Sequence, residues 1–401
     1  MSRRRGRHRA RIFGLEEVVA STGLRLERIA RRSPLRRGPH PRQAGTEYLS
    51  ALDLGTTHVK AVVCHLSQGQ VKVLGQGVAV YAGSARAEGN NQAMIQACDE
   101  ALVQAEDMTE QVCGRKIVPD QVVVGVPAST VLARSHSVRY RRRVPRDPVS
   151  ADELARVLRS AQRAALQSLL ARQNPIPDPI LLGECSAVRV EIDGHASNDP
   201  LGLRGAELSI DVLNVVTSRA MVGAIEQLAD RLKFDPPCLV LQPLAVLSAW
   251  SSELGIDGVG IDVGGRRTTL ALWQAGLLRG LISLPVGGRD LTAQLGRAGR
   301  LDESQAERLK LAYSQDRLGA EQCELVQETL RPEIERCVGA IAKGLHTLAG
   351  GKPLPPDLWV WGGGSHLLDL VESLEAMTRS DILSFSGYPS VRSLAGLPHP
   401  R

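Results

Sequence analysis

Three apolar runs, each ending in a glycine turn, constrain the fold of this 401-residue chain more than any other feature. They are LDLGTTHVK at 52–60, IDVGGRRTT at 261–269 and WVWGGGSH at 359–366. Glycine carries no side chain, so backbone N–H groups in such a turn can approach an anion closely. An aspartate at the end of the strand can hold Mg²⁺ through water. Because the first two runs lie in the two halves of the chain, they indicate duplicated subdomains.

The residues around these turns alternate between strand and helix patterns, which predicts an α/β fold. Residues 47–66 are predicted to form a β-hairpin, since apolar and β-branched residues flank the Gly-Thr-Thr turn. Further strands are expected at 70–80, 121–130 and 238–241, helices at 91–108, 219–232 and 243–254, a mostly helical stretch from 291 to 350, and a strand, glycine turn and helix at 357–377.

The stretch between residues 136 and 216 has a different pattern. The charged strand HSVRYRRRV precedes an amphipathic run over 150–173, where Ser150 is expected to cap the helix with Glu153 as its partner. Strands are expected at 187–194 and 206–218. This order predicts a separate small α+β module.

Charge and cysteine usage exclude several function classes. The chain has a net charge of +6 and a pI near 9.1, but residues 1–47 carry 13 Arg and 4 Glu, so the remainder is mildly acidic. Aromatic residues make up only 3%, which supplies few stacking platforms and makes nucleic acid an unlikely partner. Seven cysteines without a CxxC pair indicate neither a zinc site nor a disulfide framework. We therefore expect a cytoplasmic protein.

The three turns, in this order, resemble the first phosphate, second phosphate and adenosine segments of the actin-like ATPase superfamily. Between them, LVLQPLAVLSA at 239–249 resembles the connecting helix of that superfamily. Within it, the sequence is most similar to the bacterial cell-division protein FtsA family. Residues 190–216 resemble the end of the family's 1C subdomain, and LPVGGRDLTAQL with AERLKLAY resembles the start of its IIB subdomain. The resemblance extends from about residue 48 to about 392.

The resemblance implies an α/β, actin-like two-lobed fold with an inserted small α+β (1C-like, SHS2) subdomain. It places the first lobe (IA) at 48–135 and 217–255, the insert at 136–216, and the second lobe at 256–401. The second lobe would be IIA with a helical IIB-like insert at about 286–350. The family implies binding of ATP and Mg²⁺, self-association into protofilaments and a partnership with the tubulin-like protein FtsZ, whose ring it links to the membrane at the septum.

The same resemblance assigns roles to individual residues. Asp53 and Asp262 are expected to hold Mg²⁺, Asp262 also being catalytic, and Gln242 is expected to orient the hydrolytic water. Glu307 and Lys310, three positions apart on one helix face, either reach the nucleotide or form a surface ion pair. The other expected nucleotide contacts are Gly55, Thr56, Thr57, Gly264, Gly265, Arg266, Arg267, Thr268, Gly362, Gly363 and Gly364.

The second turn departs from the family's pattern, which is similar to DIGGGTTD. Arg266 stands in place of a glycine, Arg267 in place of a threonine, and Thr269 in place of the second carboxylate. The two arginines either pair with phosphates or are solvated. Loss of the carboxylate predicts at most a slow ATPase, and a pseudo-ATPase interaction protein is an alternative. The turn is also similar to that of PilM, the actin-like protein of type IV pilus assembly. A sugar kinase of the same superfamily is a further alternative, but no aspartate is placed to act as the base for a sugar hydroxyl.

The basic segment 1–47 has two interpretations. It is expected to be a disordered extension, or a product of a start codon assigned too far upstream. Alternatively, RIFGLEEVVASTGLRLERIARR at 11–32 combines apolar and cationic positions as surface-binding amphipathic helices do. It would then replace the C-terminal membrane helix typical of FtsA, which is not recognisable after residue 388. The protein would in that case be peripheral at the inner face of the cell membrane.

Overall fold

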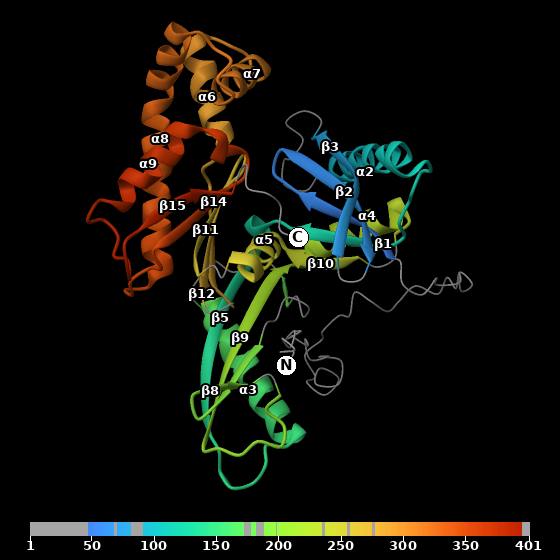
Figure 1. The fold of residues 1–401 in the computed structure, drawn as a ribbon, viewed down its shortest axis with the longest axis vertical. Coiled ribbons are helices and arrows are strands. Elements are labelled where there is room, and N and C mark those ends of the chain that lie inside the picture. Colours follow the sequence, from blue (N-terminus) through green and yellow to red (C-terminus); the bar gives the residue numbers. More distant parts are fainter. Residues whose placement is uncertain are drawn as a thin grey trace, which may run out of the picture.

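The structure, a computed structural model, describes residues 47–67, 70–81, 91–171, 178–181, 188–197, 199–234, 237–254, 257–274 and 277–394. The predicted basic extension therefore lies outside the described residues, apart from Glu47. Figure 1 shows two lobes side by side, with a smaller module below them that is built from the middle of the chain. None of the described helices is both long and apolar enough to cross a membrane.

The first lobe is built on a five-stranded sheet in the order β10-β4-β1-β2-β3. β1, β2 and β3 form an antiparallel meander, while β4 and β10 run parallel to β1 and to each other. The predicted hairpin is thus confirmed. The strands are β1 (Glu47–Leu54), β2 (His58–Ser67), β3 (Gln70–Val80), β4 (Val122–Val126) and β10 (Cys238–Leu241), and the helices are α2 (Asn91–Cys113), α4 (Arg219–Leu232) and α5 (Gln242–Leu254).

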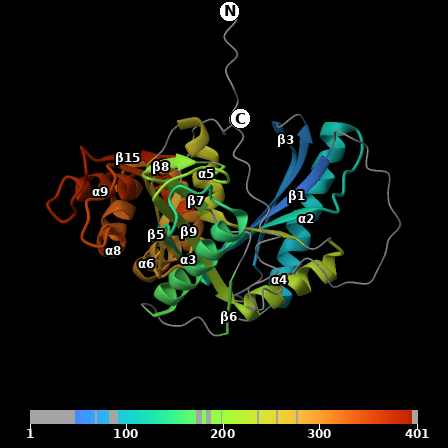
Figure 2. The ribbon, with the colours of Figure 1, turned by 90° about the horizontal axis from the view of Figure 1, so that it is seen from below.

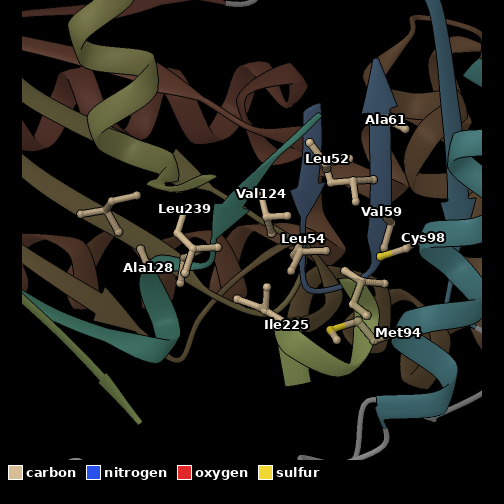
Figure 3. Packing of buried hydrophobic residues seen from close by; sticks show 14 of the residues in the cluster. Leu52, Leu54, Val59, Ala61, Met94, Cys98, Val124, Ala128, Ile225 and Leu239 are labelled. Carbon is tan, nitrogen blue, oxygen red and sulfur yellow. The ribbon is translucent and has the colours of Figure 1, made fainter. Parts of the chain in front are cut away.

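One face of this sheet packs closely against α2. Leu52 and Val59 project from it into the core, where Met94 and Cys98 of the helix meet them (Figure 3). Gly75 and Gly77 of β3 permit the approach: a Cβ on either would lie about 2 Å from a carbonyl oxygen of α2. The small residues of β3 therefore fix which face of the hairpin the helix covers.

The second lobe repeats the same topology, with strand order β13-β12-β11-β14-β15. β11, β12 and β13 are an antiparallel meander, and β14 and β15 continue the sheet in parallel. The predicted α/β class with duplicated subdomains is confirmed. The strands are β11 (Gly258–Val263), β12 (Thr268–Gln274), β13 (Leu277–Leu284), β14 (Asp357–Trp361) and β15 (Ser390–Ser393), and the helices are α6 (Gly288–Gly299), α7 (Glu303–Ser314), α8 (Ala320–Ala349) and α9 (Leu368–Thr378).

The middle module is an α+β insert whose long strands β5 and β9 pair along their whole length. The helix α3 packs against Leu208 and Ile210 of β9, and the Ser150 hydroxyl accepts a hydrogen bond from the Glu153 N–H (3.2 Å), as predicted for the cap. The boundaries predicted at 136 and 216 fall inside β5 and β9. The elements are η1 (Ala128–Thr130), β5 (Val131–Arg141), α3 (Ala151–Ala171), β6 (Pro179–Leu181), β7 (Val188–Ile192), β8 (His195–Ser197) and β9 (Glu207–Ser218).

The insert joins the second lobe edge to edge. Gly280 of β13 pairs with Arg134 of β5, which extends the second lobe's sheet into the insert and makes one ten-stranded sheet. The Arg279 guanidinium donates to the Asp211 carboxylate of β9 at 3.0 Å. Figure 2 shows the insert beside both lobes, so this seam is one of the connections that set their relative position.

Candidate functional site

Two aspartates occupy equivalent positions in the two repeated sheets. Asp53 is the next-to-last residue of β1, and Asp262 is the next-to-last residue of β11. Burial raises the pKa of Asp53 above its ordinary value, although the Lys60 ammonium lowers it. The pKa of Asp262 rises to about 7, first because of burial and then because of the negative charge of Asp53. The two carboxylates therefore lie close enough to repel each other across the junction of the lobes.

This pair has the properties of a cation site that lacks some of its ligands. Two half-buried carboxylates, of which Asp53 raises the pKa of Asp262, gain most from a positive charge placed between them. Within the described ranges, no group of three or more His, Cys, Asp or Glu side chains could hold a metal ion. A Mg²⁺ ion here would complete its shell with water and with oxygens of a bound ligand, which is how Mg²⁺ is usually held beside phosphates.

The first and second glycine turns meet each other between the lobes. The Arg266 N–H donates to the Thr56 hydroxyl at 3.1 Å. A Cβ on Gly265 would lie 2.5 Å from the Thr57 methyl carbon, so only glycine permits this approach. We refer to Asp53, Asp262 and these two turns as the interlobe site.

Hydrogen bonds from the start of α6 fix the second turn. The carbonyl oxygens of Gly264 and Gly265 accept from the N–H groups of Gly288 (2.9 Å) and Arg289 (2.6 Å). A Cβ on Gly287 would lie 2.7 Å from both of those oxygens. The PVGG sequence before α6 therefore holds the backbone of the turn, a role that the sequence did not indicate.

The two arginines of the second turn differ in their surroundings. The Arg267 guanidinium donates to the Ser283 hydroxyl (2.8 Å) and carbonyl (3.0 Å) on β13. In contrast, the Arg266 Nε is buried and has no hydrogen-bond partner among the described residues. Arg267 is thus committed to the sheet, whereas Arg266 has a donor left for an anion; nucleotide contact by either stays a prediction.

Gln242 lies against the first aspartate at the start of α5. Its amide nitrogen donates to Asp53 Oδ1 and is 3.4 Å from the Gly125 carbonyl oxygen. A Cβ on Gly125 would lie 3.1 Å from the Gln242 side chain, so the glycine in β4 leaves room for it. The predicted water-orienting residue is therefore inside the interlobe site, although its catalytic role stays a prediction.

Thr269 shares a face with Asp262. The two residues are direct partners in the antiparallel pair of β11 and β12, and such partners project from the same side of a sheet. Thr269 is buried, with 7% of its surface exposed. A neutral side chain therefore lies beside Asp262, at the position where the resemblance predicts a second carboxylate.

Glu307 and Lys310 form a local network on α7. The buried Lys310 ammonium donates to the Gly288 carbonyl (3.0 Å), the Thr292 hydroxyl (2.8 Å) and the Glu307 carboxylate (2.8 Å). Burial raises the pKa of Glu307, but the hydrogen bonds from Lys310 and Thr292 outweigh it and bring the pKa below its ordinary value. The pair ties α7 to α6 rather than forming a solvated surface pair, and its contact with a nucleotide stays a prediction.

The third glycine turn packs directly on the second aspartate. Gly362 follows β14 with φ of 86° and ψ of 174°, a region that glycine alone adopts readily. A Cβ on it would lie 2.4 Å from Asp262 Oδ1, and a Cβ on Gly364 would lie 2.2 Å from the Val263 side chain. Gly363 has open space around its Cα. All three glycine turns are therefore brought together around Asp262.

Two further residues complete the site and were missed in the sequence. Lys60 pairs with Asp53 across β1 and β2, with its ammonium 3.9 Å from Asp53 Oδ2. Lys60 could have been found from its place on the strand after the first turn, in a stretch where polar and apolar residues alternate. Trp361 pairs with Asp262 in parallel strands and forms a hydrogen bond to it. No sequence pattern indicated that contact.

Comparisons with known proteins agree with this architecture. Residues 259–395 match the family model of the cell division protein FtsA. The cell division protein FtsA of Bacillus subtilis (strain 168) is 23% identical over 238 residues, which cover 58% of this chain and 50% of that protein. The match thus spans half the length of the curated relative. A solved PilM-PilN type IV pilus biogenesis complex is similar with a TM-score of 0.58 and 17% identity, covering 86% of this chain and 90% of that chain.

The repeated sheets, the facing Asp-x-Gly turns and these likenesses define the class of protein: the chain has an actin-like ATPase fold, as predicted. Within this class its sequence is similar to that of FtsA, and the match to the family model lies in the second lobe.

Proposed function

We propose that the protein is a nucleotide-binding scaffold of bacterial cell division, as its FtsA-like sequence indicates. The observation that carries the proposal is the convergence of Asp53, Asp262 and three glycine turns at one point between the lobes. Glycine turns can bring backbone N–H groups close to phosphates, and the carboxylate pair suits Mg²⁺. The role is that of an assembly switch, in which bound nucleotide sets the contact between the lobes.

The residues present fit ATP and Mg²⁺. The buried Arg266 Nε offers a donor to an anion, and the Lys60 ammonium adds a positive charge beside Asp53. Asp53 and Asp262 would hold Mg²⁺, which supplies charge neutralisation at the phosphates. The first two turns with Thr56 and Thr57 would bind phosphates, and the turn at 362–364 would line the adenosine. Thr268, which the sequence also suggested for the phosphates, is buried, and its hydroxyl donates to the Val286 carbonyl at 2.9 Å. Gln242, already hydrogen-bonded to Asp53, would orient a water.

Hydrolysis is expected to be slow because Thr269 leaves the site without its second base. Replacing Thr269 with Asp restores a carboxylate next to Asp262, and we expect ATP turnover to increase about tenfold or more, since a positioned base contributes at least that factor. Phosphate release measured at saturating ATP tests this. Thr269→Asn is the uncharged control of similar size. Turnover unchanged by Thr269→Asp, with ATP binding intact, would contradict the assignment.

Substitutions of the two arginines of the second turn are expected to change different properties: ATP affinity for Arg266 and the free energy of unfolding for Arg267. Arg266→Gln removes the charge whose Nε lacks a partner, and a charge-assisted hydrogen bond of about 1.5–3 kcal/mol corresponds to about 10- to 100-fold weaker ATP binding. Arg267→Gln breaks the bonds to Ser283 and should instead lower the free energy of unfolding by about 1 kcal/mol. Titration with a fluorescent ATP analogue and denaturant unfolding measure the two effects. Equal affinities of Arg266→Gln and the parent chain would show that Arg266 does not face the phosphates.

The partners belong to the same proposal. An FtsA-like scaffold would bind the tubulin-like FtsZ, self-associate into protofilaments and act in the cytoplasm at the inner face of the membrane. Co-sedimentation with FtsZ filaments, with and without ATP, tests the first of these. If the chain does not sediment with FtsZ filaments under either condition, the division role is wrong even where ATP binds.

A pilus-assembly role like that of PilM is the second candidate. The sequence feature that favours it is the second turn, which keeps Asp262 and Gly264 and then continues through Thr268 and Thr269 into Leu270. The FtsZ experiment distinguishes the two roles, because a PilM-like protein has no reason to bind FtsZ. The anchor predicted for residues 1–47 lies outside the described residues and stays a prediction.

A further inference from the structure

The end of the α+β insert exposes a cluster of apolar side chains. Two loops form this end, residues 141–149 at the end of β5 and residues 199–206 before β9, and it lies away from both lobes in Figure 1. Val144, Leu201 and Leu203 are 51%, 40% and 44% exposed. Large apolar side chains scattered singly on a surface need no explanation, but three in two adjacent loops mark an interaction site. We call residues 141–149 and 199–206 the insert tip.

A buried arginine fixes the two loops of the insert tip. The Arg142 guanidinium donates to both carboxylate oxygens of Glu153, at 3.0 and 2.7 Å, and these hydrogen bonds lower the pKa of Glu153 below its ordinary value. It also donates to the carbonyl oxygens of Asp147 and Gly205, both at 3.0 Å. One side chain therefore joins α3 to both loops. The exposed apolar residues are held on a fixed base, which lowers the entropy cost of binding through them.

The backbone of the insert tip is largely paired within itself. The Val149 N–H donates to the Leu203 carbonyl at 2.8 Å, and the Gly202 N–H donates to the Val149 carbonyl at 3.0 Å. The Gly205 N–H donates to the Pro145 carbonyl at 3.2 Å. Three positions are prolines, which carry no N–H: Pro145, Pro148 and Pro200. A lipid interface favours backbone whose polar groups are paired, whereas a peptide that joins as an extra strand needs unpaired groups. The insert tip thus suits a lipid surface better than a peptide.

Positive charge surrounds the apolar residues of the insert tip. Its exposed charged residues are four arginines and two aspartates: Arg141, Arg143, Arg146, Arg204, Asp147 and Asp199. The guanidinium groups of Arg141, Arg143 and Arg146 form no ion pair with another described residue. Asp193, next to the tip, has its carboxylate hydrogen-bonded to the N–H groups of Ala206 (2.9 Å) and Glu207 (2.8 Å). Exposed apolar side chains among unpaired arginines are the chemistry of surfaces that bind anionic lipid.

We infer that the insert tip binds the surface of an anionic lipid bilayer. Val144, Leu201 and Leu203 enter the boundary between headgroups and acyl chains, and the arginines around them pair with lipid phosphates. None of these residues belongs to the interlobe site, so the inference does not depend on nucleotide binding. It assigns a membrane contact to the described part of the chain.

Co-sedimentation of the full chain with phosphatidylglycerol vesicles, over a range of lipid concentrations, tests the inference. Val144→Ser with Leu203→Ser should raise the lipid concentration for half-maximal binding about tenfold or more, because two of the three apolar contacts are lost. Both side chains are exposed, so the fold should tolerate the change. Arg143→Gln with Arg146→Gln should weaken binding by about the same factor on these vesicles, but not on neutral phosphatidylcholine vesicles. The matched control, Val112→Ser with Val118→Ser, changes residues that are 51% and 61% exposed on the first lobe and should bind as the parent does.

A second measurement locates the contact. In Val144→Trp, the new indole should be quenched by lipids brominated in their acyl chains, beyond the quenching seen in the parent chain with its four tryptophans. Val118→Trp, which places the same side chain on the first lobe, should show no additional quenching. This comparison separates the insert tip from any membrane contact made by residues 1–47, because such a contact would be the same in both variants.

Equal binding of the parent and the Val144/Leu203 variant to phosphatidylglycerol vesicles would overturn the inference. Equal quenching of the two tryptophan variants would also overturn it, because the lipid contact would then lie elsewhere. If the Val144/Leu203 variant binds vesicles as the parent does but no longer sediments with FtsZ filaments, the insert tip contacts protein and the lipid assignment is wrong.

Discussion

Replacing Asp262 with Asn is expected to make the ligand-free protein more stable at pH 8 while it abolishes Mg²⁺-dependent nucleotide binding. The pKa of Asp262 is about 7 in the folded protein, against an ordinary value of 3.8. A raised pKa means that the folded state favours the protonated form, so this contribution to stability is lost as the pH rises through 7. At pH 8 the buried charge costs on the order of 2–4 kcal/mol, which the neutral Asn avoids.

Denaturant unfolding at pH 5 and pH 8 measures this effect. The parent chain should lose more stability between the two pH values than Asp262→Asn does. The exposed Asp120, changed to Asn, is the control and should leave the pH dependence as it is in the parent. If Asp262→Asn is less stable than the parent at pH 8, the ionised Asp262 carboxylate does not destabilise the ligand-free protein, and this prediction is wrong.

Gly362→Ala is expected to have the second large effect, a loss of about 2–4 kcal/mol in the free energy of unfolding. The backbone conformation at this position is one that glycine alone adopts readily, and the new methyl group would meet Asp262 Oδ1 and the Val263 carbonyl. The backbone strain and the steric contacts of the methyl group both arise at residue 362, so relieving one of them leaves the other in place. Thermal and denaturant unfolding of the purified variant measure the loss.

Gly363→Ala is the matched control, since it adds the same methyl group one residue further along. No atom lies within 4 Å of the position its Cβ would take, and we expect stability to change by less than about 1 kcal/mol. Because the turn is expected to line the adenosine, Gly363→Ala should still weaken ATP binding. Similar destabilisation by both substitutions would mean that the third turn is not shaped by its contact with Asp262.

Local pattern was sufficient to predict the parts of the fold that depend on near neighbours in the sequence. The hairpin at 47–66, the repeated Asp-x-Gly turns and the cap at Ser150 follow from periodicity, turn chemistry and capping, which operate over a few residues. The pairing of Gly280 with Arg134 was not predicted, because it joins two edge strands far apart in the chain. Edge pairing of this kind leaves no periodic signal in either strand.

The site was predicted in outline for the same reason. The aspartates and glycines belong to contiguous motifs, so Asp53, Asp262 and Gly362 could be selected from the sequence. Arg266 and Arg267 could not be told apart, because adjacent residues in a turn have identical sequence context and differ only in what surrounds them. Ser283 and the buried environment of the Arg266 Nε decide the difference, and both arise from tertiary packing.

Calorimetric titration of the full chain with ATP, in the presence and absence of Mg²⁺, tests the central claim most directly. The account predicts binding that requires Mg²⁺ and that weakens about tenfold or more in Asp53→Asn, which removes one of the two carboxylates and its pairing with Lys60. Thr269→Asn, which leaves both aspartates in place, should bind ATP as the parent does. Absence of detectable binding at millimolar ATP and Mg²⁺, or equal affinity of the parent and Asp53→Asn, would contradict the account.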